Sequence, residues 1–164
     1  MSSARPLGPP RLVKAIQERS VRPLRGVALF ATTGTVSASV TAMNPMLSGR
    51  RQMADVAVRT AHTGLPQVVG LAVDEDGIDV YPLTLSGHVT DDAITRWGKG
   101  AFSAATSRRL LVIQLAIVLR SGNRFQLETK SFPIGVNKHN ATVAHMIVGM
   151  ANAQSVADSG PGPA

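Results

Sequence analysis

The chain has 164 residues, 44% of them hydrophobic and 16% charged, which suits one domain with a buried core and short appendages. It contains no cysteine, which excludes disulfides, thiolate catalysis and cysteine-ligated metals. Among its four histidines, His139 and His145 lie six residues apart on one expected helix and point in different directions. We therefore expect neither a metal site nor a cofactor.

The formal net charge of +7 is unevenly distributed along the chain. Residues 1–25 hold six bases against Glu18, residues 74–92 hold six acids and no Lys or Arg, and residues 93–138 hold eight bases against Glu128. A basic half beside an acidic band is compatible with an anionic partner, and equally with charge that only keeps a surface soluble. Charge alone does not decide between these interpretations.

The first 25 residues predict a basic, flexible leader. Pro6, Pro9 and Pro10 are typical of an irregular segment, and Pro10 and Pro23 bound a short helical stretch. The apolar side chains of that stretch are few, so we expect the helix to dock loosely.

Residues 26–49 carry no charge, and their structure is open between two alternatives. Val36, Ala38 and Val40 alternate with hydroxyl residues, which favours a half-buried strand. Upstream bases and the small residues around Ala42 also fit a cleaved targeting segment. We favour the strand. We expect a cytoplasmic protein, which could also bind peripherally to a membrane. Residues 50–62 predict a helix.

Two hairpins are predicted between residues 67 and 131. The first joins the apolar run 67–73 to residues 78–83 through a turn at 74–77. The second spans Leu110–Ser131, with alternate apolar residues on one face. A loop of residues 121–123 would set Leu119 opposite Phe125 and Ile117 opposite Leu127, keeping the apolar residues on one face. The same register places Arg120 beside Arg124.

The last predicted element is an amphipathic helix over residues 140–153, which Asn137 or Asn140 would cap. Val143, Met146, Ile147 and Met150 form its apolar stripe, which we expect to seal an open end of the sheet. Residues 154–164 contain little to bury, and we expect a disordered tail. Residues 26–153 would thus form a single domain.

The order of these elements resembles the pleckstrin-homology-like (PH-like) domains of actinobacterial proteins. The tracts that carry the resemblance are Gly64–Pro66 running into Val69–Asp74, Ile78–Tyr81, Ile94–Trp97, Leu110–Phe132 and the helix from Asn140. The resemblance implies an α+β fold, a mainly antiparallel β barrel or sandwich capped by a C-terminal helix, and a binding module or scaffold. Members that hold phosphoinositides carry bases on the first hairpin, whereas residues 27–42 here contain none.

Motifs for catalysis or ion binding are incomplete. A calcium loop around residues 74–79 would need acids where Ala72 and Leu83 stand. A phosphate-binding loop ending at residues 98–100 lacks its first glycine and its hydroxyl residue. Ser86, His88 and Asp91 share one loop, a proximity expected by chance. We therefore expect a protein that is not an enzyme.

The leading hypothesis is a non-catalytic module of PH-like type that mediates protein–protein contacts. The alternative is binding of an anionic surface, nucleic acid or acidic lipid, through an Arg-rich patch, and the third hypothesis is a small hydrolase or ligand-pocket protein. An exposed strand edge also permits a homodimer. The candidate interaction patch comprises Arg108, Arg109, Arg120, Arg124, Lys130 and Trp97.

Overall fold

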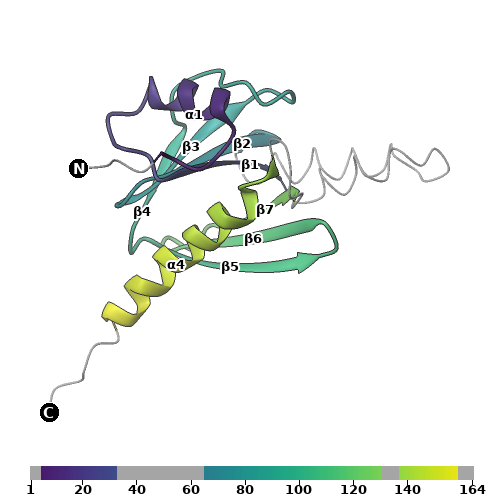
Figure 1. The fold of residues 1–164 in the computed structure, drawn as a ribbon. Coiled ribbons are helices and arrows are strands. Elements are labelled where there is room, and N and C mark those ends of the chain that lie inside the picture. The colour runs from purple at the N-terminus through teal and green to yellow at the C-terminus, as the bar shows by residue number, and fades with distance from the viewer. Residues whose placement is uncertain (1–4, 33–64, 131–136, 159–164) are drawn as a thin grey trace, which may run out of the picture.

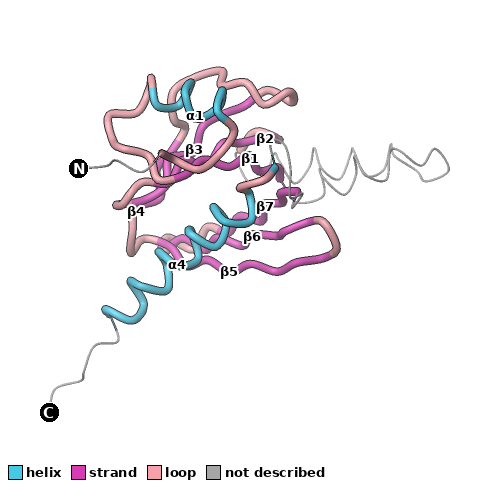
Figure 2. Tube along the Cα trace, in the orientation of Figure 1, coloured by secondary structure: helices cyan, strands magenta, loops and turns pink. Residues whose placement is uncertain are grey.

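The computed structural model describes residues 5–32, 65–130 and 137–158. They form an α+β fold in which one seven-stranded antiparallel sheet packs against helices (Figures 1 and 2). In chain order the elements are α1 (Pro10–Gln17), β1 (Gly26–Thr32), β2 (Val68–Val73), β3 (Gly77–Leu83), β4 (Thr95–Gly98), β5 (Phe102–Arg109), β6 (Val112–Leu119), β7 (Arg124–Lys130) and α4 (Asn140–Asp158).

The central strand β1 joins two halves of the sheet. The strand order is β4-β3-β2-β1-β7-β6-β5, and no pairing between described residues closes β4 onto β5. We name the two parts the β1–β4 half and the β5–β7 half. Figure 1 shows them as an upper and a lower layer, with α4 running across the space between them.

The main core lies between the two halves and beneath α4. Trp97 of β4 and Phe125 of β7 come from opposite halves, and their ring centroids are 5.1 Å apart. Val143, Ile147 and Met150 of α4 are buried against the same cluster, which confirms the predicted apolar stripe; Met146 is half-buried beside it. The terminal helix therefore covers the open side of the curled sheet.

A second cluster covers the outer face of the β1–β4 half. Leu12 and Ile16 of α1 are buried against Val27, Val68 and other apolar residues of β1–β3. The predicted short helix is thus present but closely packed, because its few apolar residues meet an apolar sheet face rather than water.

The residues that precede α1 are also held to the sheet. The Leu7 amide donates to the Arg25 carbonyl at 3.1 Å, and the Val27 amide donates to the Leu7 carbonyl at 2.8 Å. Gly8 permits this approach, because a Cβ there would lie 2.4 Å from the Val27 carbonyl oxygen. Residues 5–25 therefore belong to the fold, and the expectation of a flexible leader is wrong for them.

The β2–β3 hairpin confirms the first predicted hairpin. All six residues of β2 are buried, because one face meets the main core and the other meets the α1 cluster. Because neither face of this strand meets water, its side chains do not alternate between apolar and polar, which explains the continuous apolar run.

The β6–β7 hairpin is present, but its predicted register is wrong by two residues. Ile117 pairs with Phe125 and Leu115 with Leu127. Gly122 has a φ of +98° and occupies the third place of a loop formed by residues 120–122. Such three-residue loops place a left-handed residue at that point, which favours glycine. The two-residue shift keeps the apolar face intact, and it separates Arg120 from Arg124, which pairs with Val118.

The start of the second hairpin also differs from the prediction. Leu110 and Leu111 form a two-residue turn that links β5 to β6, since Arg109 pairs with Val112. The predicted first strand of this hairpin therefore begins at residue 112. β5 itself was not predicted, although Phe102, Ala104 and Thr106 alternate with more exposed residues along it.

Helix α4 extends five residues beyond its predicted end at residue 153, into the segment assigned to the tail. Alanines at 151, 153 and 157 favour helix there, and Gly160 and Pro161 follow. At its start the Asn140 side-chain Nδ2 donates to the Lys130 carbonyl at 3.1 Å, which ties α4 to the end of β7. The strand predicted around residues 36–42 and the helix predicted at 50–62 lie outside the described residues.

Candidate functional site

An ion-pair network lies on the outer face of the β1–β4 half. It joins Arg96 to two residues of the acidic segment 74–92, Asp74 and Asp79. The Arg96 guanidinium donates to both oxygens of Asp74, at 2.8 and 2.9 Å, and to Asp79 at 3.0 Å. The pairing of β3 with β4 sets Arg96 opposite Asp79, and the β2–β3 turn brings Asp74 alongside. The geometry is that of a bidentate, partly buried salt bridge.

The network changes the titration of both partners. Burial of Asp74 raises its pKa, but hydrogen bonds from Arg96 and from the Asp76 amide, with the charges of Arg96 and Arg22, outweigh burial and leave the pKa below its ordinary value. The hydrogen bond to Asp74 raises the pKa of Arg96 despite burial, and the bond to Asp79 adds to it. The Asp74 carboxylate is therefore ionised near neutral pH and is held in its ion pair with Arg96.

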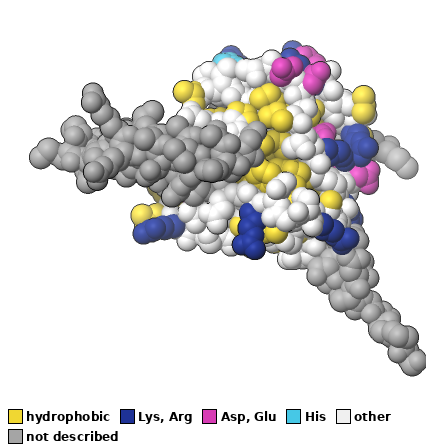
Figure 3. Space-filling view, turned by 180° about the vertical axis from the view of Figure 1, so that it is seen from behind, with side chains coloured by type: hydrophobic (Ala, Val, Ile, Leu, Met, Phe, Trp, Pro, Cys, Tyr) yellow, Lys and Arg dark blue, Asp and Glu magenta, His cyan; other side chains and the backbone are white. Residues whose placement is uncertain are grey.

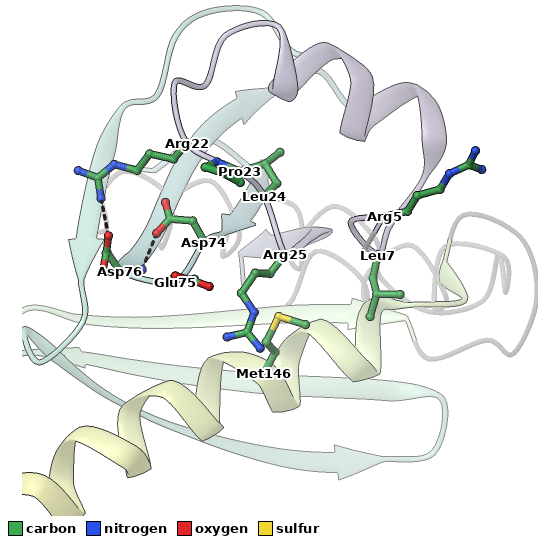
Figure 4. Close-up of a pocket in the computed structure, with 10 residues that line it drawn as sticks. All are labelled: Arg5, Leu7, Arg22, Pro23, Leu24, Arg25, Asp74, Glu75, Asp76 and Met146. Atoms are coloured by element: carbon green, nitrogen blue, oxygen red, sulfur yellow. Dashed lines mark hydrogen bonds and ion pairs between the residues drawn. The ribbon is translucent and has the colours of Figure 1, made fainter. Parts of the chain in front are cut away.

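A hollow of about 650 Å³ opens beside this network (Figure 4). It is lined by the β2–β3 turn, by residues 22–25, by Arg5 and Leu7, and by Met146 of α4. Arg22 pairs with Asp76 at 3.4 Å, Arg25 reaches toward Met146, and Arg5 points outward. Acids and bases are mixed along its wall, so the hollow has no strong preference for either sign of charge.

The motifs considered for ion binding and catalysis do not form sites among the described residues. No group of three or more metal-ligating side chains gathers there. In the β3–β4 loop the Ser86 and Thr84 hydroxyls lie 2.9 Å apart, and the His88 amide donates to Thr84, but no described hydrogen bond links the His88 ring to Ser86 or Asp91. Asp92 instead pairs with Arg19 at 3.0 Å.

The predicted interaction patch is divided between the two ends of the β5–β7 half. Arg108 and Arg109 end β5, whereas Arg120 lies in the loop at the other end of β6 and Arg124 begins β7. The eight residues of β6 separate these ends by roughly 25 Å, more than twice the Debye length of about 8 Å at physiological salt. The two pairs therefore do not act as one charged surface.

Trp97 does not belong to the patch. It is 2% exposed and packs against Phe125 in the main core. Its place in β4 opposite Ile78 turns the ring inward, so the expectation that it contributes to an exposed patch is wrong.

Lys130, in contrast, lies at the same end of the β5–β7 half as Arg108 and Arg109. Val112 pairs with Arg109 on one side and with Lys130 on the other, which sets the two basic residues on one cross-strand row. Leu110 and Leu111, 88% and 50% exposed, project beyond that row. We name these five residues, Arg108, Arg109, Leu110, Leu111 and Lys130, the hairpin tip. Its leucines were not predicted as exposed, because the apolar pattern of residues 110–119 indicates a strand there.

The surroundings of the hairpin tip are basic. Glu128 is the one acid in β5–β7; it is 1% exposed and accepts a hydrogen bond from Gln114 at 3.3 Å. Lys138 is exposed just before α4, whose first residue contacts Lys130. Figure 3 shows basic side chains along the lower edge of this face, while the acidic ones lie at the top and at the right-hand side. Among the described residues, no ion pair links an acid to Arg108, Arg109 or Lys130, so this part of the structure gives the hairpin tip a positive charge.

Comparisons with known proteins were made for the sequence and for the fold. No protein-family model matches the chain, and no significantly similar curated protein or solved structure was found. The functional assignment therefore depends on the physical properties of the hairpin tip and the sheet.

Within the described ranges, the helices are too short or too polar to cross a bilayer.

Proposed function

We propose that the protein is a non-catalytic binding module whose hairpin tip docks on a negatively charged, phosphate-bearing surface. The observation that carries this proposal is the gathering of Arg108, Arg109 and Lys130 at one end of the β5–β7 half, where β5–β7 expose no acid. Arginine and lysine side chains bind phosphate oxygens by charge-assisted hydrogen bonds.

The distribution of the acids supports a binding role over a catalytic one. Asp74 and Asp79 are bound to Arg96, and Asp76 and Asp92 are bound to Arg22 and Arg19. The hydrogen bonds and charge of Arg96 hold the pKa of Asp74 below its ordinary value, so this carboxylate is a poor proton acceptor.

The fold is compatible with a PH-like domain, and we propose that the protein belongs to the PH-like family. Support comes from the seven-stranded antiparallel sheet and from the C-terminal helix that covers the core. β1 (Gly26–Thr32) carries no base, so the proposed docking surface differs from the first-hairpin site expected of phosphoinositide-binding members.

The test is binding of the full chain to three polyanionic probes: heparin, a DNA duplex and phosphatidylserine vesicles. We expect binding to at least one probe to fall steeply between about 50 and about 300 mM salt. The Arg108→Glu/Arg109→Glu variant should lose it, while the control Arg120→Glu/Arg124→Glu, with the same change in charge, should retain most of it. Equal losses in the two variants, or no binding by the wild type, would overturn the proposal.

A second candidate function, contact with another protein, is favoured by the outer edge of β5, which pairs with no further strand among the described residues. This strand lies at the end of the sheet, and its residues 102–107 carry no charge and no proline. Such an edge accepts a further strand, including that of a second copy in antiparallel orientation. Ala105→Lys would block this pairing, and sedimentation of the wild type and the variant at increasing concentration would show whether copies associate there.

A further inference from the structure

We infer that the surface bound by the hairpin tip is an acidic lipid bilayer, and that Leu110 and Leu111 insert into it. The inference rests on the proposed function and names its partner. Bases alone do not distinguish lipid from nucleic acid, since both present phosphates. The leucines make the distinction, because only the bilayer offers an apolar phase beneath its phosphates.

The exposure of the leucines is the first supporting observation. Leu110 is 88% exposed and Leu111 50%, and they are adjacent on the same turn. Among the described residues, Val21, Leu85 and Ile94 are also exposed, but none of them is adjacent in the sequence to a second exposed large hydrophobic residue. Single-stranded nucleic acids are commonly bound by aromatic side chains that stack on the bases, and the hairpin tip has none.

The backbone of the turn is the second observation. Leu110 has a φ of +55°, and within the described residues it is the one non-glycine with a positive φ. Two-residue hairpin turns favour glycine or asparagine at such positions, so a leucine here costs stability. Strain of this kind is retained where a side chain has a role. The Arg108 Nε donates to the Leu110 carbonyl at 3.3 Å and holds a base against the turn.

The order of residues along the hairpin matches the layers of a membrane surface. Leu110 and Leu111 lie at the extreme end, and the cross-strand row of Arg109 and Lys130 lies just behind them. Inserted apolar groups reach roughly 5–10 Å into the boundary between headgroups and acyl chains, while long basic side chains extend back to the phosphates. The hairpin tip meets both requirements in one short element.

The experiment is flotation of the full chain with vesicles of phosphatidylcholine alone or with about 30% phosphatidylserine. Each basic residue near an acidic surface should raise the affinity about fivefold. We expect binding to the acidic vesicles only. Leu110→Asn/Leu111→Ser should weaken it by about 100-fold, or tenfold for each leucine. Asparagine tolerates the left-handed backbone, so the variant should fold. The control Leu85→Ser, a leucine 77% exposed on another loop, should bind like the wild type.

The outcomes separate this inference from the proposed function. If the DNA duplex binds with the expected salt and Arg108/Arg109 dependence but the vesicles do not, the membrane inference fails and the proposed function stands. Vesicle binding that is insensitive to the leucine substitutions also overturns insertion. If none of the probes binds, both fail.

Insertion can be observed directly because the chain has no native cysteine. Leu111→Cys, labelled with an environment-sensitive fluorophore, should brighten and shift to the blue with acidic vesicles, while labelled Leu85→Cys should not. Equal responses from the two positions would contradict insertion at the hairpin tip.

Discussion

The two halves of the sheet use their faces differently. The β1–β4 half is covered on both sides, by the main core and by α1, and the two charged residues of its strands, Asp79 and Arg96, form an ion pair. The β5–β7 half has one face against the core, and its strands β5 and β6 alternate between more and less buried side chains. Covering both faces gives stability and leaves little surface for partners, whereas the half with one covered face ends in the exposed hairpin tip and an open edge.

The largest expected effect concerns the ion-pair network around Arg96 in the β1–β4 half. Arg96→Met leaves Asp74, whose side chain is 3% exposed, without its main partner. We expect a loss of about 3 kcal/mol in the free energy of unfolding. Urea unfolding followed by the fluorescence of the single tryptophan measures it; an unchanged midpoint would show that the network contributes nothing.

The same pair of proteins gives a pH test. The folded-state pKa of Asp74 lies below its ordinary value of 3.8, so its ionised form stabilises the protein above that pH, and the contribution is lost as the pH falls below 3.8. The difference in unfolding free energy between wild type and Arg96→Met should therefore shrink on acidification. A difference that is constant from neutral pH to about pH 3 would contradict this assignment.

The next prediction compares the loss of stability caused by the same substitution, valine to alanine, on the outer faces of the two halves. Val27 of β1 is fully buried beneath α1, and Val118 of β6 is only half-buried. Val27→Ala should cost about 2 kcal/mol through lost burial and a residual cavity, and Val118→Ala about a quarter of that. Equal losses, measured by urea unfolding, would show that the two outer faces are equally covered.

A smaller effect is expected at the β6–β7 loop. Gly122 has a φ of +98° and open space around its Cα, so Gly122→Ala should cost about 1 kcal/mol through backbone strain alone. Gly98 also has open space but no left-handed backbone, and Gly98→Ala serves as the control with no loss expected. A stable Gly122→Ala protein would argue against the register described here.

The smallest effect has the opposite sign and concerns the other turn. Leu110→Asn should raise the free energy of unfolding by about 0.5 kcal/mol, because asparagine accepts the left-handed conformation more readily than leucine. Leu85→Asn, on a loop without that strain, should give no gain. Lower thermal stability of Leu110→Asn than of wild type would mean that Leu110 is held by contacts rather than strained.

Much of the local structure was predictable from the sequence. The turn residues 74–77 and the apolar runs beside them identified the β2–β3 hairpin, and the spacing of Val143, Ile147 and Met150 identified the buried face of α4. These signals are local, because turn chemistry and side-chain periodicity act over a few residues. The faces of β6 and β7 were also assigned correctly for their buried residues, since a register error of two preserves the face.

The candidate site was predicted only in part. Arg108, Arg109 and Lys130 were named, but as one patch with Arg120, Arg124 and Trp97. The turn at Leu110 and Leu111 carries no glycine, asparagine or proline, so no sequence signal marked it, and the leucines were assigned to a strand. The pairing of β5 with β6 showed that they lie at the end of a hairpin.

By itself, then, the sequence determined the segments with strand or helix character, the faces that exclude water and the uneven distribution of charge. Tertiary structure decided which sheet faces are covered twice, which register the hairpin adopts and which basic residues meet. These properties depend on contacts between residues far apart in the chain, such as Ile16 beneath the sheet and Trp97 against Phe125. Local periodicity fixes the direction of a side chain relative to its own strand, but the surface it meets depends on the whole fold.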